Sequence, residues 1–117
     1  NAAFFGGLEI DEYQMHTLYI DRYPYGREAT LSFPAPDLVI RNTTPYGVLI
    51  WPTYTDTSIT VTLYSSPWVV GEQTGQVRSS AGRCTRVTTT RTRTWLDGRT
   101  EDDQFHASYQ PADGVLC

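Results

Sequence analysis

The sequence predicts a mostly β protein: an antiparallel sheet or a small open barrel, with the tail of one helix at its N-terminus and a disulfide-bridged β-hairpin after it. Three observations lead to this prediction. Apolar and polar residues alternate at the two-residue period of a half-buried strand, most clearly over residues 59–64. Pro, Gly and Asn residues separate the alternating segments, as turn residues do. The chain has two cysteines, Cys84 and Cys117, which bracket its last segment.

The first half of the chain is expected to contain the end of a helix and several strands. Residues 1–5 read as a last helical turn, because Gly6 or Gly7 can end the helix as its C-cap. Alternation and β-rich composition predict strands over 8–13, 29–33, 38–41, 48–51 and 59–64, with turns at 23–26 and 42–47.

The strand expected at residues 59–64 has the clearest pattern in the chain. Ile59, Val61 and Leu63 alternate with two threonines and a tyrosine. Successive side chains of a strand point to opposite faces. We therefore expect the three aliphatic residues to face the core.

The composition changes in the second half of the chain. Residues 67–83 are rich in Gly, Ser and Gln and read as a linker with one extended piece at 68–70. Beyond it, the Thr/Arg-rich residues 84–117 predict a β-hairpin with strands at 85–94 and 104–109 and an Asp97–Gly98 turn. This hairpin has few apolar residues, so we expect it to be stapled by the cysteines, packed on the main sheet, or both.

Length and charge set broad limits on function. A chain of 117 residues is one domain, or one domain with a small appendix. Its net charge of −4 argues against nucleic acid as a partner, which needs a basic face. Arg91 and Arg93 fall on one face of an expected strand, and we interpret that face as solvated rather than as an anion site.

His16 and His106 lack a second ligand at metal-binding spacing, so we expect neither a metal nor a cofactor.

The two cysteines have two interpretations. Cys84 and Cys117 form a disulfide that staples the tail, or they are two free thiols. We favour the disulfide, which the chain-entropy model values at roughly 3–4 kcal/mol for a loop of this length. A disulfide would in turn indicate an oxidising, extracytoplasmic location, at the cell surface or secreted.

One histidine and one carboxylate are candidates for chemistry. His16 ends an expected strand, and Glu28 follows a Gly-containing turn at the head of the next. Antiparallel neighbours joined in this way can bring an imidazole and a carboxylate together. Such a pair fixes the histidine tautomer, as a general base and its orienting group require. The alternative is an ordinary structural hydrogen bond between the two side chains.

The order of these landmarks resembles the VanW family of cell-envelope proteins. His16 is followed by the run Arg-Tyr-Pro-Tyr-Gly-Arg-Glu-Ala-Thr at 22–30 and then by Pro-Asp-Leu-Val-Ile-Arg-Asn-Thr-Thr-Pro at 36–45. The resemblance implies that residues 1–66 are the C-terminal part of a VanW-like domain. It also implies that the family's Gly-rich motif, with its Cys or Ser, would lie just before Asn1.

The resemblance assigns roles to several residues. His16 matches the family histidine, and Glu28 takes the place of the usual Asp. Tyr25 and Arg27 match the turn, and Asn42 matches an Asn that precedes the family's Thr-containing turn. A thiol or hydroxyl followed by a His and an acid is also the order of papain-like enzymes. Here the nucleophile would lie upstream, and an acid longer by one methylene would displace the carboxylate by about 1 Å or more, which is enough to cost activity.

The tyrosines around the turns suggest a binding role. Tyr23, Tyr25 and their neighbours offer faces for sugar rings and hydroxyls for polar contacts, unless they pack under the loops as core. With Arg27 and Asn42 they form the candidate binding set. The expected function is therefore binding or scaffolding at the wall, with peptidoglycan or another wall polymer as partner.

The alternative function is a remnant of an acyl-transfer or amide-hydrolase site that contains His16 and Glu28. For the whole protein the resemblance implies membrane anchoring. Exposed strand edges would also allow a homodimer.

Overall fold

The computed structural model describes residues 1–114 and 116–117, and it confirms a mostly β, antiparallel chain with one short helix at the start. The helix is α1 (Ala2–Phe5). Within the described residues the strands are, in chain order, β1 (Glu9–Glu12), β2 (Val39–Arg41), β3 (Leu49–Tyr54), β4 (Ile59–Tyr64), β5 (Val69–Ala81), β6 (Cys84–Trp95) and β7 (Thr100–Tyr109). That helix is too short to cross a membrane, and no other helix occurs in these residues.

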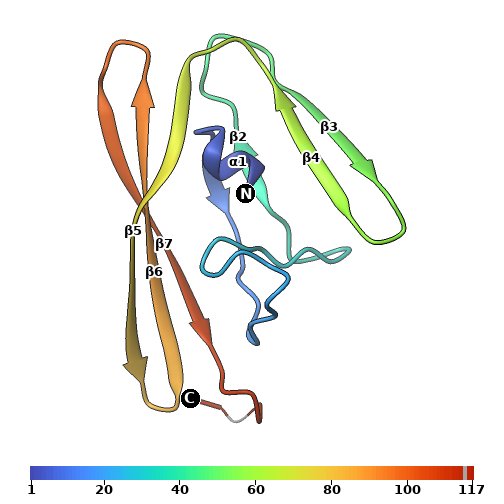
Figure 1. The fold of residues 1–117 in the computed structure, drawn as a ribbon, viewed down its shortest axis with the longest axis vertical. Coiled ribbons are helices and arrows are strands. Elements are labelled where there is room, and N and C mark those ends of the chain that lie inside the picture. Colours follow the sequence, from blue (N-terminus) through green and yellow to red (C-terminus); the bar gives the residue numbers. More distant parts are fainter. Residues whose placement is uncertain (115) are drawn as a thin grey trace.

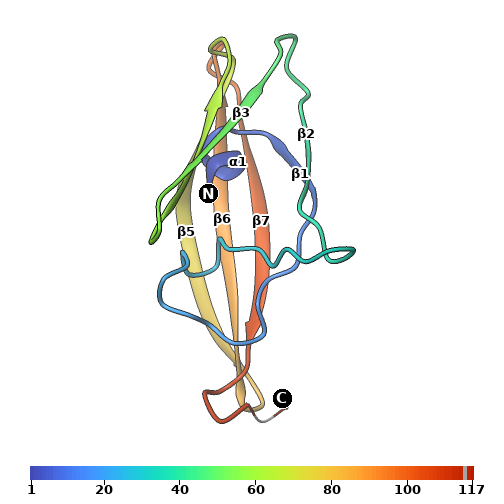
Figure 2. The same cartoon turned by 90° about the vertical axis from the view of Figure 1, so that its right-hand side faces the viewer.

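These strands form three small sheets rather than one. β1 pairs with β2, β3 pairs with β4, and β5, β6 and β7 lie side by side in that order as the C-terminal sheet. Figure 1 shows α1 between the C-terminal sheet and the β3–β4 hairpin. The segment that joins β1 to β2 crosses the face of the C-terminal sheet (Figure 2), where contacts between the two hold the candidate site.

The strand expected at residues 29–33 does not form. These residues belong to the long connection between β1 and β2, where one backbone hydrogen bond joins Thr30 N–H to Gln14 C=O at 2.7 Å. Pro34 and Pro36 follow and have no N–H to donate, which prevents a ladder from extending through this stretch. The alternation of apolar and polar residues at 29–33 therefore does not correspond to a strand.

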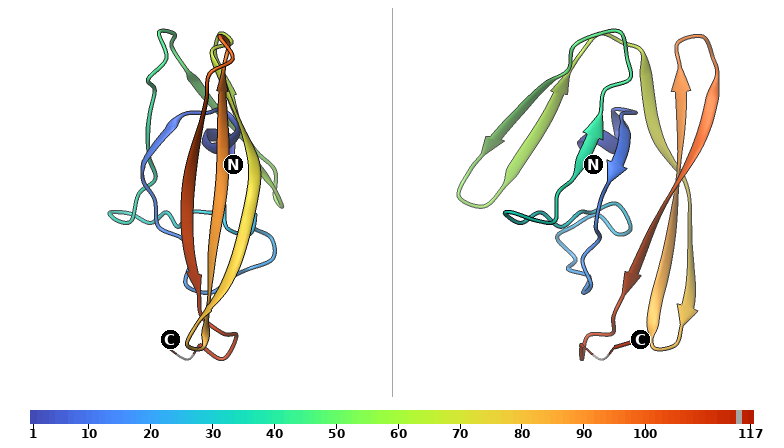
Figure 3. Two further views of the ribbon diagram at one scale, coloured as in Figure 1. Left: turned by 90° about the vertical axis from the view of Figure 1, so that its left-hand side faces the viewer. Right: turned by 180° about the vertical axis from the view of Figure 1, so that it is seen from behind.

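The β3–β4 hairpin forms as expected, but its aliphatic face is not in a core. Leu49 pairs with Tyr64, and the register continues to the pair of Tyr54 with Ile59. Ile59 is 72% exposed and Val61 is 43% exposed. In Figure 3 this hairpin stands away from the C-terminal sheet. Its apolar face instead lines a groove, described below.

Most of the expected linker at residues 67–83 is a strand. β5 pairs with β6 from Val69 opposite Trp95 to Ala81 opposite Cys84, with one shift of register between Gln73 and Gly75. The glycines of this segment contribute to its linker-like composition, but Gly71 is there for a structural reason. A Cβ atom at this position would lie 2.2 Å from the carbonyl oxygen of Phe4. The glycine lets helix α1 lie directly on the strand. The tail is thus a three-stranded sheet in which the expected hairpin is β6 and β7.

The inner face of the C-terminal sheet contains the best-buried part of the chain. Val87, Ala107 and Tyr109 form its apolar cluster, with Met15 and Tyr25 packed against it. The tail is therefore both packed on the rest of the chain and stapled by its cysteines.

Arg91 and Arg93 are also on this face, so the expectation of a solvated surface was wrong. They are 1% and 3% exposed. Arg91 Nη1 donates to the carbonyls of Phe4 and Leu8 at 3.2 and 3.0 Å. Arg91 Nη2 lies 2.8 Å from Asp103 Oδ2. These partners satisfy a buried guanidinium, and Arg91 fastens helix α1 to the sheet.

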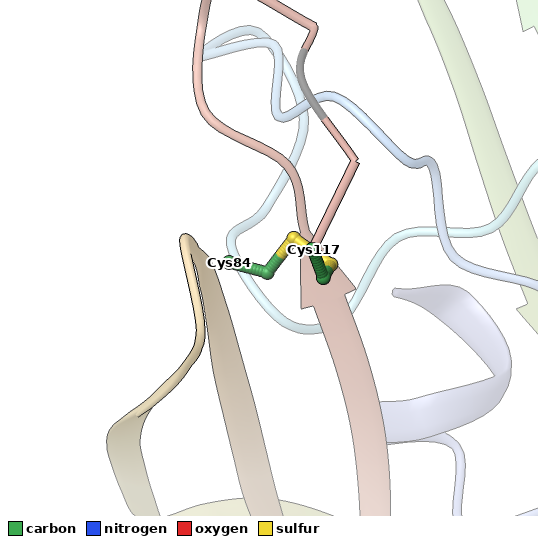
Figure 4. The surroundings of a disulfide bond; sticks show 2 residues. All are labelled: Cys84 and Cys117. Atoms are coloured by element: carbon green, nitrogen blue, oxygen red, sulfur yellow. A yellow bond between two sulfur atoms is a disulfide. The ribbon is translucent and has the colours of Figure 1, made fainter.

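The predicted disulfide between Cys84 and Cys117 is present, with the two Cα atoms 5.1 Å apart. Figure 4 shows it at the end of the C-terminal sheet, where it joins the last residue of the chain to the first residue of β6. Disulfides form and persist in oxidising compartments, so this bond indicates an extracytoplasmic location.

Candidate functional site

His16 and Glu28 are in direct contact. Both lie in the connection between β1 and β2. His16 Nδ1 is hydrogen-bonded to Glu28 Oε2. The backbone N–H of His16 also donates to this carboxylate, at 2.9 Å from Oε1 and 3.1 Å from Oε2. Glu28 therefore holds the histidine by both its ring and its backbone.

The environment of the pair determines which ring nitrogen is available. The Glu28 side chain is 3% exposed, whereas that of His16 is 27% exposed. A neutral imidazole that donates from Nδ1 to a carboxylate has its lone pair on Nε2. No hydrogen bond engages His16 Nε2 within the part of the chain that the structure describes. The pair thus leaves Nε2 free to accept a proton.

The turn before Glu28 lies unusually close to the C-terminal sheet. Gly26 has a φ of +70°, and a Cβ atom there would lie 2.5 Å from Thr89 Oγ1 and 2.8 Å from Gln76 Nε2. Gln76 Nε2 donates to the carbonyl of Tyr25 at 2.8 Å. Both the close approach and the positive φ require glycine. The turn is therefore fixed against β5 and β6, and it places Glu28 beside the sheet.

Tyr109, the last residue of β7, completes the surroundings of Glu28. Its hydroxyl donates to Glu28 Oε1 at 3.1 Å and accepts from the Gly26 N–H at 3.2 Å. Sequence reasoning missed both Tyr109 and Gln76 as parts of the site. Alternation along β7 indicates that Tyr109 shares a face with Phe105, but no local pattern says which distant polar group its hydroxyl meets.

The position of Tyr109 predicts a distinct titration. Burial, followed by the charge of Glu28, raises the pKa of Tyr109 from 10.0 to about 12. A folded-state pKa above the unfolded value means that the folded chain holds this proton more tightly. The stability from this group is therefore complete below about pH 10 and is lost as the pH rises through about 12.

Tyrosinate absorbance during an alkaline titration would test this prediction. We expect one late-titrating tyrosine in the native chain and its loss in Tyr109→Phe. An unchanged titration curve in that variant would contradict the prediction.

The candidate binding tyrosines are packed against other rings. Tyr23 stacks on His16 with ring centroids 5.0 Å apart and an interplanar angle of 9°. Tyr25 meets Tyr19 edge-on at 4.7 Å. Tyr23 thus packs against one face of the imidazole. Tyr25 packs against the apolar cluster of the C-terminal sheet. The binding role of these tyrosines stays a prediction.

Arg27 and Asn42 are in different surroundings. Arg27 Nε donates to Asn1 Oδ1 at 3.2 Å, and its guanidinium lies 5.3 Å from the ring centroid of Phe5. Asn42 instead closes its own turn, donating to the carbonyl of Tyr46 at 2.6 Å. No described contact connects Asn42 to His16 or Glu28. Arg27 is therefore the candidate binding residue with a cationic side chain next to the pair.

A groove of about 750 Å³ passes Glu28 and Arg27. Tyr23 and Asn1 also line it, whereas Tyr25 does not. Most of its lining is aliphatic or aromatic. It comes from α1, from strands β1 to β4 and from the connection between β1 and β2, including Phe4, Ile10, Ile40, Ile50, Val61 and Leu63. The groove is thus an apolar cleft with a few polar groups in its lining, which is a common form of ligand site.

No three His, Cys, Asp or Glu side chains gather as metal ligands within residues 1–114 and 116–117.

Comparison with known proteins agrees with the landmarks in the sequence. A family model described as "VanW like protein" matches residues 1–64. This match covers the helix, β1 to β4, His16, Glu28 and Arg27, and it ends before the C-terminal sheet. No curated protein and no solved structure matches the chain.

Proposed function

The chain belongs to the VanW-like family, and from this premise we propose that it supplies the base half of an acyl-transfer or amide-hydrolase site in the cell envelope. The observation that carries the proposal is the contact between His16 Nδ1 and Glu28 Oε2. The carboxylate is buried and the imidazole is partly open, as a base and its orienting group need to be. The Cys84–Cys117 disulfide supports an extracytoplasmic place of action, where wall peptides supply amide bonds.

The proposed chemistry assigns each group one task. His16 Nε2 takes the proton of a thiol or hydroxyl as the nucleophile attacks the acyl carbon. Glu28 fixes the ring orientation and stabilises the imidazolium. The proton then passes to the departing amine.

The nucleophile in this proposal comes from outside the described residues, as the family resemblance implies. Cys84 and Cys117 are bonded to each other, and the described residues contain no free cysteine.

Turnover of wall fragments by the full-length protein tests the proposal. Peptidoglycan fragments would be incubated with the protein, and hydrolysed or transferred products would be measured by mass spectrometry. Removing a general base costs about 10²- to 10⁴-fold in rate, which is the loss we expect for His16→Ala. Glu28→Gln should also slow turnover, because a neutral amide stabilises an imidazolium poorly.

The other histidine provides the matched control. His106 lies on β7 and is exposed, and its Nδ1 is 3.2 Å from Thr88 Oγ1. His106→Ala should leave turnover unchanged. Turnover that survives His16→Ala at full rate would refute a base role for His16.

The groove favours a second candidate, which is binding of a wall polymer without turnover. Arg27 and Tyr23 line this cleft, which is large enough for a small ligand. Calorimetric titration of this chain with soluble wall fragments would then show saturable binding that persists in His16→Ala and is weakened in Arg27→Ala. The absence of any saturable binding would rule this candidate out.

A further inference from the structure

Tyr109 connects the part of the chain that the family model matches with the C-terminal sheet, which the model does not match. His16 and Glu28 lie inside residues 1–64, which the family model matches, whereas Tyr109 ends β7 in the C-terminal sheet. One buried hydroxyl reaches from that sheet into the site. The question is whether the sheet is an appended support or a working part of the site.

The contacts of this hydroxyl are specific. Tyr109 is 4% exposed. Its hydroxyl donates to Glu28 Oε1 at 3.1 Å and accepts from the Gly26 N–H at 3.2 Å. The other carboxylate oxygen, Oε2, is the one that meets His16 Nδ1. The hydroxyl therefore holds one oxygen of the carboxylate while the other oxygen holds the imidazole.

A second contact connects β7 to the segment next to His16. The backbone N–H of Gln110 donates to the carbonyl of Thr17, the residue after His16, at 2.8 Å. The end of β7 thus fixes the site at Glu28 through a side chain and beside His16 through the backbone.

We propose that Tyr109 is a positioning residue for the His16–Glu28 pair, so that the C-terminal sheet is part of the site and not an appendix to it. Without the hydroxyl, the carboxylate can rotate away from His16 and the Gly26 N–H loses its acceptor. A buried donor without a partner is unfavourable, which favours rearrangement of the turn. The catalytic meaning of this role rests on the proposed function, but the positioning itself concerns only the geometry of the chain.

The tautomer of His16 gives a direct test. Long-range proton–nitrogen NMR of this chain reports which ring nitrogen of neutral His16 has the proton. We expect protonation at Nδ1 in the unmodified chain. In Tyr109→Phe, which removes a single oxygen atom, the population of the Nδ1-protonated form should fall.

Tyr25→Phe is the matched control. Its ring lies in the same cluster, with its centroid 5.2 Å from that of Tyr109, and no described hydrogen bond involves its hydroxyl. The tautomer should be unchanged in this variant. An unchanged tautomer in Tyr109→Phe overturns the proposal. An equal change in both variants would mean that ring packing, not the hydroxyl, positions the pair, and this result would also overturn it.

A second measurement covers the case in which Tyr109→Phe does not fold. In the unmodified chain, a hydroxyl proton of Tyr109 that donates to Glu28 should exchange slowly enough with water to give its own NMR signal. A hydroxyl proton in fast exchange would contradict the proposal. Neither measurement requires turnover, so a failed turnover assay and a failed positioning test are separate results.

Discussion

Replacing Arg91 with methionine is expected to lower the free energy of unfolding by about 3–5 kcal/mol. Arg91 is 1% exposed and makes polar contacts with Asp103 and with carbonyls at both ends of the turn that follows α1. Methionine fills a similar volume but donates no hydrogen bond. The substitution therefore removes one of the two charged partners of Asp103, the other being Arg93. It also leaves buried carbonyls without a donor, which is costly.

Urea unfolding of Arg91→Met and Arg86→Met measures this effect against a matched control. Arg86 lies on the same strand but is exposed, and no described ion pair includes it. Its substitution should change stability by no more than about 0.5 kcal/mol. If the two variants unfold at the same urea concentration, the Arg91 contacts contribute no net stability.

Removal of the disulfide is the second large effect. Cys84 and Cys117 are 33 residues apart in sequence, and the chain-entropy model gives roughly 3–4 kcal/mol for closing such a loop. The double variant Cys84→Ser/Cys117→Ser should lose about this amount, mainly because its unfolded chain is less constrained. A double substitution avoids leaving one unpaired thiol.

A reducing agent provides an independent test of the same bond. Reduction should lower the unfolding midpoint of the unmodified chain to nearly that of the double variant, and it should leave the double variant unchanged. If reduction destabilises both proteins equally, the loss comes from the reductant and not from the disulfide.

The sequence features that predicted the structure correctly are local or covalent. The Asp97–Gly98 turn joins β6 to β7 because glycine reaches the positive φ that a tight turn needs. The disulfide could be predicted because the chain has two cysteines and the segment between them is long enough to fold back on itself. The His16–Glu28 contact followed from a turn that reverses the chain between them.

The features that the sequence did not predict depend on distant partners. Residues 69–81 look like a linker by composition, and they form a strand because β6 supplies its entire ladder. Arg91 and Arg93 look like a solvated face, and they are buried because both pair with Asp103. Arg91 also donates to a carbonyl of α1, and Arg93 donates to Glu9. Ile59 and Val61 have the pattern of core residues, yet both are exposed, because their face lines the groove and is not packed in a core. Tyr109 belongs to the same class, since its partner Glu28 is 81 residues away in sequence.

The disulfide also determines how a pulling force would pass through the molecule. Tension applied at residue 117 enters the main fold at Cys84, because the sulfur–sulfur bond is the shortest covalent route. β7 lies on the bypassed part of the chain, between the two cysteines. If the chain is stretched at its end, segments outside the disulfide loop would therefore extend first. β7, which contains Tyr109, would bear no tension and would keep its position beside His16 and Glu28.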